Sequence, residues 1–202
     1  LGEQVWKLHA RDLTNFPAKH IIGWSTGGLA AYGEALTRPD RIGKIALIAP
    51  GIVPNWFVGE QHPFARGFKR KFNQITMETL TTADYSKGLA NPHLEPIKPG
   101  SPLEAFGGFA WDLLQTAKEA RQIDVPARVR GFVLLSGKND TYVDAKKTLK
   151  VLKKRVPDFG VGFSAKVYPG ALHEIDNEVE PIASEAHRDI VDFLTGARQP
   201  GQ

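Results

Sequence analysis

Apolar residues gather into short runs that alternate with longer stretches of helical periodicity. The short runs predict buried strands at 19–22, 44–49, 128–136 and 163–168. They are rich in isoleucine, valine and leucine with few polar breaks, which is typical of strands buried on both faces. Apolar positions repeat with a helical period at 3–16, 29–38, 144–155 and 179–195. This alternation favours an α/β fold in which helices flank a parallel sheet.

The alternation of strand-like and helix-like segments is interrupted over residues 52–122, which are rich in aromatic side chains and contain several prolines and glycines. We therefore divide the chain into a core over 1–51 and 123–202 and a mainly helical cap inserted over 52–122. Within this cap, Phe64, Phe68 and Phe72 fall on one face of a predicted helix. The helix is either an ordinary packed helix, the lining of an acyl pocket, or an interfacial helix resting on anionic membrane.

Composition restricts the class of protein without naming it. The chain has 202 residues, 42% of them hydrophobic and 24% charged, which suits one globular domain with an insertion. Its net charge of +4 is mild, so it permits contact with anionic lipid but does not suggest a nucleic-acid partner. Because there is no cysteine, disulfides and thiol catalysis are excluded. No apolar run is long enough to span a bilayer. We expect a cytoplasmic or peripheral membrane location.

The first predicted strand leads into Gly23-Trp24-Ser25-Thr26-Gly27, a G-x-S-x-G pattern followed by a helix. A serine between strand and helix in this pattern sits on a strained turn that exposes its hydroxyl. We expect Gly23 and Gly27 to be glycines because side chains two positions away would collide with the turning backbone. The Thr26 N–H, directly after the serine, then becomes a candidate oxyanion donor. Alone, the pattern would also fit a flexible Gly/Ser loop.

Ser25, Asp140 and His173 each follow the end of a predicted strand. In a parallel sheet these ends share one edge, so we expect the three side chains to converge there. Serine needs a base within hydrogen-bond reach to become nucleophilic, which assigns His173 as the base. Asp140 would hold the imidazole and stabilise its charged form.

Other assignments of these residues stay open. Asp140 could cap a turn, in which case Asp144 is the alternative acid, although Asp144 is better placed to cap the next helix. His173 could be a simple surface histidine. We expect the acidic residues after it, up to Glu178, at a helix start, where carboxylates favour the helix dipole. No zinc motif is present, because Asn177 stands where a second histidine would be required.

Three segments resemble signature sites of the α/β-hydrolase superfamily, and their closest likeness is to its lysophospholipase and monoacylglycerol lipase-like (serine aminopeptidase-like) branch. The segments are Gly23–Gly28, Ser136–Asp140 and Tyr168–Ile175. The resemblance covers about residues 15–195. It implies an inserted cap, no cofactor, and hydrolysis of a small-molecule lipid ester through an acyl-enzyme on Ser25. The resemblance also makes Trp24, Phe64, Phe68 and Phe72 candidate substrate-binding residues.

The chain departs from that family at its start. Only about twenty residues precede the serine turn, whereas the family has several strands and a second oxyanion donor before it. The first strand would then be an exposed sheet edge, which native folds avoid. We expect a companion N-terminal segment or chain that completes the sheet. An acyltransferase or peptidase of the same fold, and a non-catalytic acyl-binding module, are the alternative functions.

Overall fold

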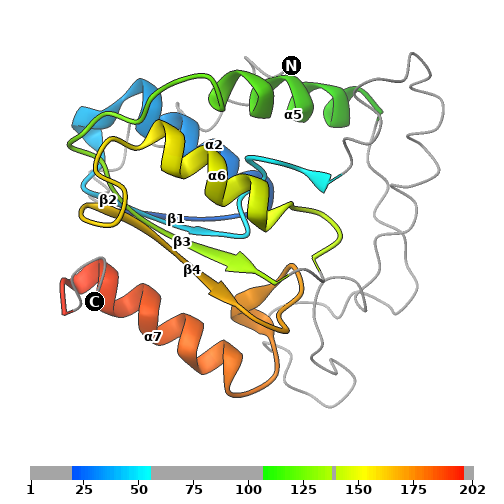
Figure 1. Ribbon diagram of the computed structural model, residues 1–202, viewed down its shortest axis with the longest axis vertical. Coiled ribbons are helices and arrows are strands. Elements are labelled where there is room, and N and C mark those ends of the chain that lie inside the picture. Colours follow the sequence, from blue (N-terminus) through cyan, green and yellow to red (C-terminus); the bar gives the residue numbers. More distant parts are fainter. Residues whose placement is uncertain (1–19, 56–106, 138–139, 198–202) are drawn as a thin grey trace.

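Four parallel strands organise the part of the chain that the structure, a computed structural model, describes: residues 20–55, 107–137 and 140–197. The strands are β1 (His20–Trp24), β2 (Lys44–Ile48), β3 (Arg130–Ser136) and β4 (Phe163–Tyr168). They lie side by side in chain order, all parallel. One row across the sheet runs Ile22, Ala46, Phe132, Ser164. All four carboxyl ends therefore point to the same edge of the sheet (Figure 1).

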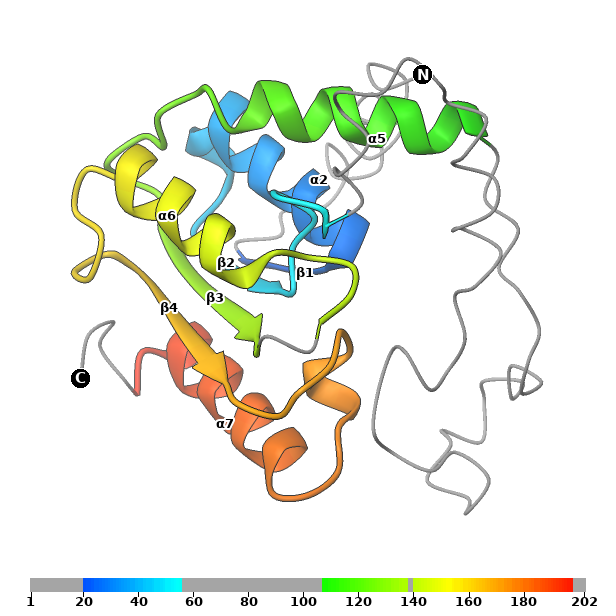
Figure 2. The same cartoon turned by 45° about the vertical axis from the view of Figure 1, so that its right-hand side comes forward.

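Helices cover both faces of this sheet. On one face lie α2 (Ser25–Thr37) and α6 (Ala145–Arg155), and α5 (Gly107–Ala120) packs against α2 (Figures 1 and 2). The other face is covered by α7 (Ile182–Thr195). Short 3₁₀ turns, η1 (Pro39–Arg41) and η5 (Ile175–Asn177), complete the described elements. The prediction of an α/β fold with helices on both sides of a parallel sheet is confirmed.

The core sits around the two central strands. Alternate residues of β2 and β3 enter two apolar clusters, one under α2, α5 and α6 and the other under α7. Leu47 and Val133 belong to the first cluster, whereas Ile48 and Leu134 belong to the second, and all four are buried. Because both faces of these strands are covered, their sequences read as unbroken apolar runs. By contrast, Ile22 and Trp24 on β1 are 55% and 40% exposed.

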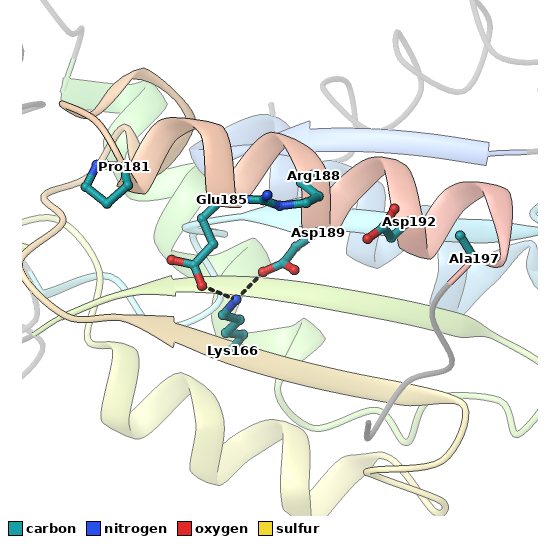
Figure 3. A pocket seen from close by; sticks show the side chains of 7 residues that line it. All are labelled: Lys166, Pro181, Glu185, Arg188, Asp189, Asp192 and Ala197. Carbon is teal, nitrogen blue, oxygen red and sulfur yellow. Dashed lines mark hydrogen bonds and ion pairs between the residues drawn. The ribbon is translucent and has the colours of Figure 1, made fainter.

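Polar contacts attach α7 to β4. The Lys166 ammonium pairs with Glu185 at 2.7 Å and with Asp189, and the Tyr168 hydroxyl donates to Asp189 at 2.7 Å. Burial lowers the pKa of Lys166, but its hydrogen bonds to the two carboxylates outweigh that effect, and the pKa lies above its usual value. Lys166, Glu185 and Asp189 are among the residues that line a pocket between β4 and α7 (Figure 3).

The predicted division into core and cap is not tested by this structure, and the predicted helices at 3–16 and around Phe64 lie outside the described residues. Two observations bear on the cap boundaries. Ile52 and Val53 are buried in the first core cluster, and so are Ala117 and Ala120 of α5. Both ends of the 52–122 segment are therefore part of the packed core. Among the described helices, none is long and apolar enough to cross a bilayer.

Candidate active site

Ser25 lies at a sharp turn between β1 and α2. Its φ is +51°, in the left-handed region that non-glycine residues rarely adopt. The next loop of the chain supports the turn, because the Gly51 N–H donates to the Ser25 carbonyl at 2.9 Å. A Cβ on Gly23 would lie 2.6 Å from the Gly27 carbonyl oxygen. The sequence therefore folds here into the strained strand-to-helix turn that was predicted, and Gly23 is required by space.

The explanation for Gly27 was wrong. A Cβ at Gly27 would meet nothing within 4 Å, so this position has room for a side chain. The close approach is made at Gly28, where a Cβ would lie 2.9 Å from the Pro50 Cβ and 3.0 Å from the Gly23 carbonyl oxygen. The second glycine that the turn needs is thus one residue further along, where α2 packs against the loop after β2.

The structure brings the three predicted site residues together. The Ser25 Oγ lies 2.7 Å from His173 Nε2, and His173 Nδ1 lies 3.1 Å from Asp140 Oδ2. His173 is 2% exposed and Asp140 is 4% exposed. Each residue follows a strand, and the strands end at one edge of the sheet, so residues distant in sequence meet there. This geometry allows a proton to pass from the serine hydroxyl to the imidazole.

Asp140 is held by four donors, only one of which is the imidazole. The Ser136 hydroxyl donates to Oδ2 at 2.5 Å. The backbone N–H groups of Tyr142 and Val143 donate to Oδ1 at 2.7 and 3.0 Å. Burial alone would raise the pKa of Asp140, but the hydrogen bonds from His173, Ser136 and Tyr142 bring the pKa below its usual value. Asp140 is therefore a carboxylate at neutral pH, as the partner of a charged imidazole must be.

Asp144 has a different place. Its carboxylate accepts the Lys147 N–H at 2.8 Å at the start of α6, which makes it the N-cap of that helix. It also pairs with the Lys147 ammonium at 3.0 Å. The alternative in which Asp144 replaces Asp140 beside the histidine does not fit these contacts.

Residues at the start of the predicted cap hold the loop that carries Asp140. The Asn55 side chain donates to the Asp140 carbonyl at 2.9 Å, and the Asn55 N–H donates to the Tyr142 carbonyl at 2.7 Å. The Asp144 N–H donates to the Val53 carbonyl at 2.8 Å. The first residues after β2 thus pair with the loop that carries Asp140, and both segments set the position of the Asp140 carboxylate.

The histidine loop is anchored by Glu178, which we expected at a helix start. It follows the 3₁₀ turn η5 instead, is 4% exposed, and accepts the Leu172 N–H at 2.6 Å. The Glu178 carboxylate thus holds the backbone of the residue next to His173. Sequence reasoning missed this role and that of Ser136, because both depend on loop conformation. The only signal was that Ser136 ends the strand leading to Asp140.

The remaining predicted site residues are placed as follows. Thr26 lies in the first turn of α2, where N–H groups have no acceptor within the helix. Trp24 precedes Ser25 and contacts His173. Phe64, Phe68 and Phe72 lie outside the described residues. Within the described ranges, no group of three or more histidine or acidic side chains is arranged to hold a metal ion.

Solved structures share this fold. A soluble variant of monoglyceride lipase from Saccharomyces cerevisiae superposes with a TM-score of 0.71 over 96% of this chain and 70% of that chain, at 17% identity. The monoacylglycerol lipase of Paleococcus ferrophilus gives a TM-score of 0.69 over 98% of this chain and 76% of that chain, at 18% identity. The sheet, the covering helices and the serine turn thus define an α/β-hydrolase fold.

The family can be stated more narrowly. The family model described as serine aminopeptidase, S33, matches residues 8–180, and the chain belongs to that family. Curated relatives include pimeloyl-[acyl-carrier protein] methyl ester esterases. That of Cronobacter sakazakii is 28% identical over 75% of this chain and 61% of its own length. That of Legionella pneumophila is 25% identical over 76% of this chain and 65% of its own length. The chain therefore matches less than two thirds of the length of these relatives.

Proposed function

We propose that the whole protein is a carboxylic ester hydrolase that forms an acyl-enzyme on Ser25. The observation that carries the proposal is the continuous series of hydrogen bonds from the Ser25 hydroxyl through His173 to the Asp140 carboxylate. Membership of a serine hydrolase family and the esterase names of its relatives support the same reaction class. A cofactor is not part of the proposal.

The proposed reaction has two halves. The Ser25 hydroxyl gives its proton to His173 Nε2 as its oxygen bonds to the ester carbonyl carbon. The tetrahedral intermediate collapses when His173 protonates the leaving alcohol and the carbon–oxygen bond to that alcohol breaks. Water then gives a proton to His173 as its oxygen bonds to the acyl carbon. The bond between that carbon and Ser25 Oγ breaks as His173 returns the proton to Oγ, which releases the carboxylic acid and restores the Ser25 hydroxyl. Asp140 stays ionised and stabilises the imidazolium formed in each half.

One oxyanion donor comes from this chain in the proposal, the Thr26 N–H at the start of α2. The helix N-terminus adds a partial positive charge beside Ser25. A second donor would come from the companion N-terminal segment or chain that we propose alongside β1. Removing one such donor typically costs on the order of 10²–10³ in rate. The activity of the whole protein should therefore greatly exceed that of residues 1–202 alone.

The apolar edge strand supports the proposed companion. β1 pairs with β2 on one side, and no other described strand pairs with its outer side. Its Ile22 and Trp24 side chains lie on the same face of the sheet as Ala46 and Ile48, which α7 buries, yet they are themselves exposed. Exposed apolar edges of this kind invite another strand. The curated relatives are longer than the matched part of this chain, which leaves room for such a segment in them.

We propose lipid-type esters, either lysophospholipids or monoacylglycerols, as the substrate class. A second candidate is a methyl ester on an acyl chain, which the names of the curated relatives favour. A substrate panel separates them: one monoacylglycerol, one lysophospholipid and one fatty acyl methyl ester of equal acyl length. Preference for the methyl ester by more than tenfold would replace the first candidate by the second. An amino-acid amide and an acceptor alcohol in the panel would reveal a peptidase or an acyltransferase.

A fluorophosphonate probe tests the reaction class directly in the whole protein. We expect covalent labelling that is lost in Ser25→Ala and reduced at least about 10³-fold in rate in His173→Ala. Ser164→Ala on β4 is the matched control, because Ser164 lies on the same sheet away from the site. It should label like the unchanged protein. Absence of labelling in the folded, unchanged protein would favour a non-catalytic acyl-binding module.

A further inference from the structure

Two aromatic rings contact the catalytic imidazole in this fold. The Trp24 ring centroid lies 5.5 Å from that of His173, with the planes inclined at 54°. The Tyr142 ring centroid lies 4.9 Å from it, inclined at 53°. One ring comes from the residue before Ser25 and the other from the loop after Asp140. The imidazole is thus touched by neighbours of both of its hydrogen-bond partners.

Trp24 makes a second contact with the same residue. Its indole N–H donates to the backbone carbonyl of His173 at 3.3 Å. One side chain therefore holds both the ring and the backbone of the histidine. Because Trp24 is bonded directly to Ser25, this contact joins the nucleophile segment to the histidine loop independently of the Oγ–Nε2 hydrogen bond.

The histidine loop needs such an anchor. It begins after β4 ends at Tyr168 and reaches η5 at Ile175, so no strand or helix holds His173 itself. Glu178 fixes the loop through the Leu172 N–H, one residue before the histidine. Among the described residues, the Trp24 indole provides the hydrogen bond that joins the backbone of His173 to the segment carrying Ser25. A misplacement of a reacting group by about 1 Å can cost on the order of 10²-fold in rate.

Resting on the proposed function, we propose that Trp24 is a positioning residue that keeps His173 within reach of the Ser25 hydroxyl. The competing role is an apolar contact with the acyl chain, for which the 40% exposure of Trp24 leaves surface available. The two roles differ in what they change. A positioning residue sets the rate of the chemical steps for every substrate, whereas an acyl contact sets binding in proportion to acyl length.

Trp24→Phe and Trp24→Leu separate the two roles in the whole protein. Phenylalanine keeps a ring but loses the N–H, so we expect kcat to fall about 10-fold with KM unchanged. Leucine loses both contacts, and we expect a fall of about 100-fold. The factors should be equal for esters of short and long acyl chains. Val191→Ala, a change at an exposed apolar residue on α7, is the control and should leave both constants unchanged. A rise in KM that grows with acyl length, at constant kcat, would overturn the proposal.

A second readout does not depend on activity. Hydrogen–deuterium exchange of the peptide covering residues 169–175 reports how often the histidine loop opens. We expect exchange in this peptide to be at least about tenfold faster in Trp24→Phe than in the unchanged protein or in Val191→Ala. Unchanged exchange would overturn the proposal even if activity falls. If the unchanged protein neither hydrolyses esters nor reacts with the fluorophosphonate, the proposed function fails, while this exchange measurement still decides the role of Trp24.

Discussion

Buried hydroxyl groups in this protein differ in whether they have a hydrogen-bond partner. Those of Ser136 and Tyr168 donate to carboxylates, at 2.5 Å to Asp140 and at 2.7 Å to Asp189. The Tyr32 hydroxyl on α2 is also buried, but it has no partner among the described residues. Burial raises the pKa of Tyr32, so the phenol stays neutral. The hydroxyls of Ser136 and Tyr168 fix the orientation of a carboxylate. The Tyr32 hydroxyl has lost its contact with water without gaining a hydrogen bond among the described residues.

Replacing each tyrosine by phenylalanine should give opposite results. Tyr32→Phe removes an unpaired buried hydroxyl, so we expect the free energy of unfolding to rise by about 1 kcal/mol. Tyr168→Phe removes a donor from the buried Asp189, and we expect a loss of about 1–2 kcal/mol. Urea denaturation of both variants in one buffer measures the difference. Equal destabilisation by the two changes would mean that the Tyr32 hydroxyl is satisfied in solution.

At the scale of elements, the sequence predicted the positions of the strands and helices more accurately than it predicted how they pack. The run from Phe163 to Tyr168 was predicted to the residue, and the run beginning at Lys44 was predicted one residue too long. The apolar alternation is local, so it is readable without the fold. The serine turn could also be predicted from the sequence, but the reason why particular positions in it must be glycine could not. Which glycine is crowded depends on Pro50, whose position is set by β2 and not by the motif.

Alanine at the two neighbouring glycines of α2 tests that reason. Gly27 has open space and lies in a helix, so Gly27→Ala should stabilise the protein by about 0.5–1 kcal/mol. At Gly28 the new Cβ would press on Pro50 and on the Gly23 carbonyl, so we expect Gly28→Ala to cost about 1–3 kcal/mol. Thermal unfolding followed by circular dichroism ranks the two variants. The reverse order would restore Gly27 as the sterically required position.

For the whole molecule, the topology was predictable and the supporting contacts of the site were not. Parallel strands alternating with helices imply that strand ends meet, and this rule located Ser25, Asp140 and His173. The contacts of Trp24 and Glu178 with the histidine loop join segments separated by loops of irregular backbone, whose course no periodicity encodes. Whether the outer side of β1 is covered is also decided at the scale of the whole molecule, because it depends on which other strand or segment pairs with this sheet.

A charge placed on β1 tests whether that side is covered in the whole protein. Ile22 is 55% exposed here, so if the edge is bare, Ile22→Glu should cost no more than Val167→Glu on the opposite edge strand, where the side chain is 44% exposed. We expect the Val167 change to cost under about 1 kcal/mol. If a companion strand or segment packs over β1, the glutamate is buried without a partner, and the cost rises to about 2 kcal/mol or more. We predict this larger loss for Ile22→Glu, measured by urea denaturation of the whole protein with Val167→Glu as the control. Matching small losses would show that β1 is a solvated edge, and the proposed companion would then be withdrawn.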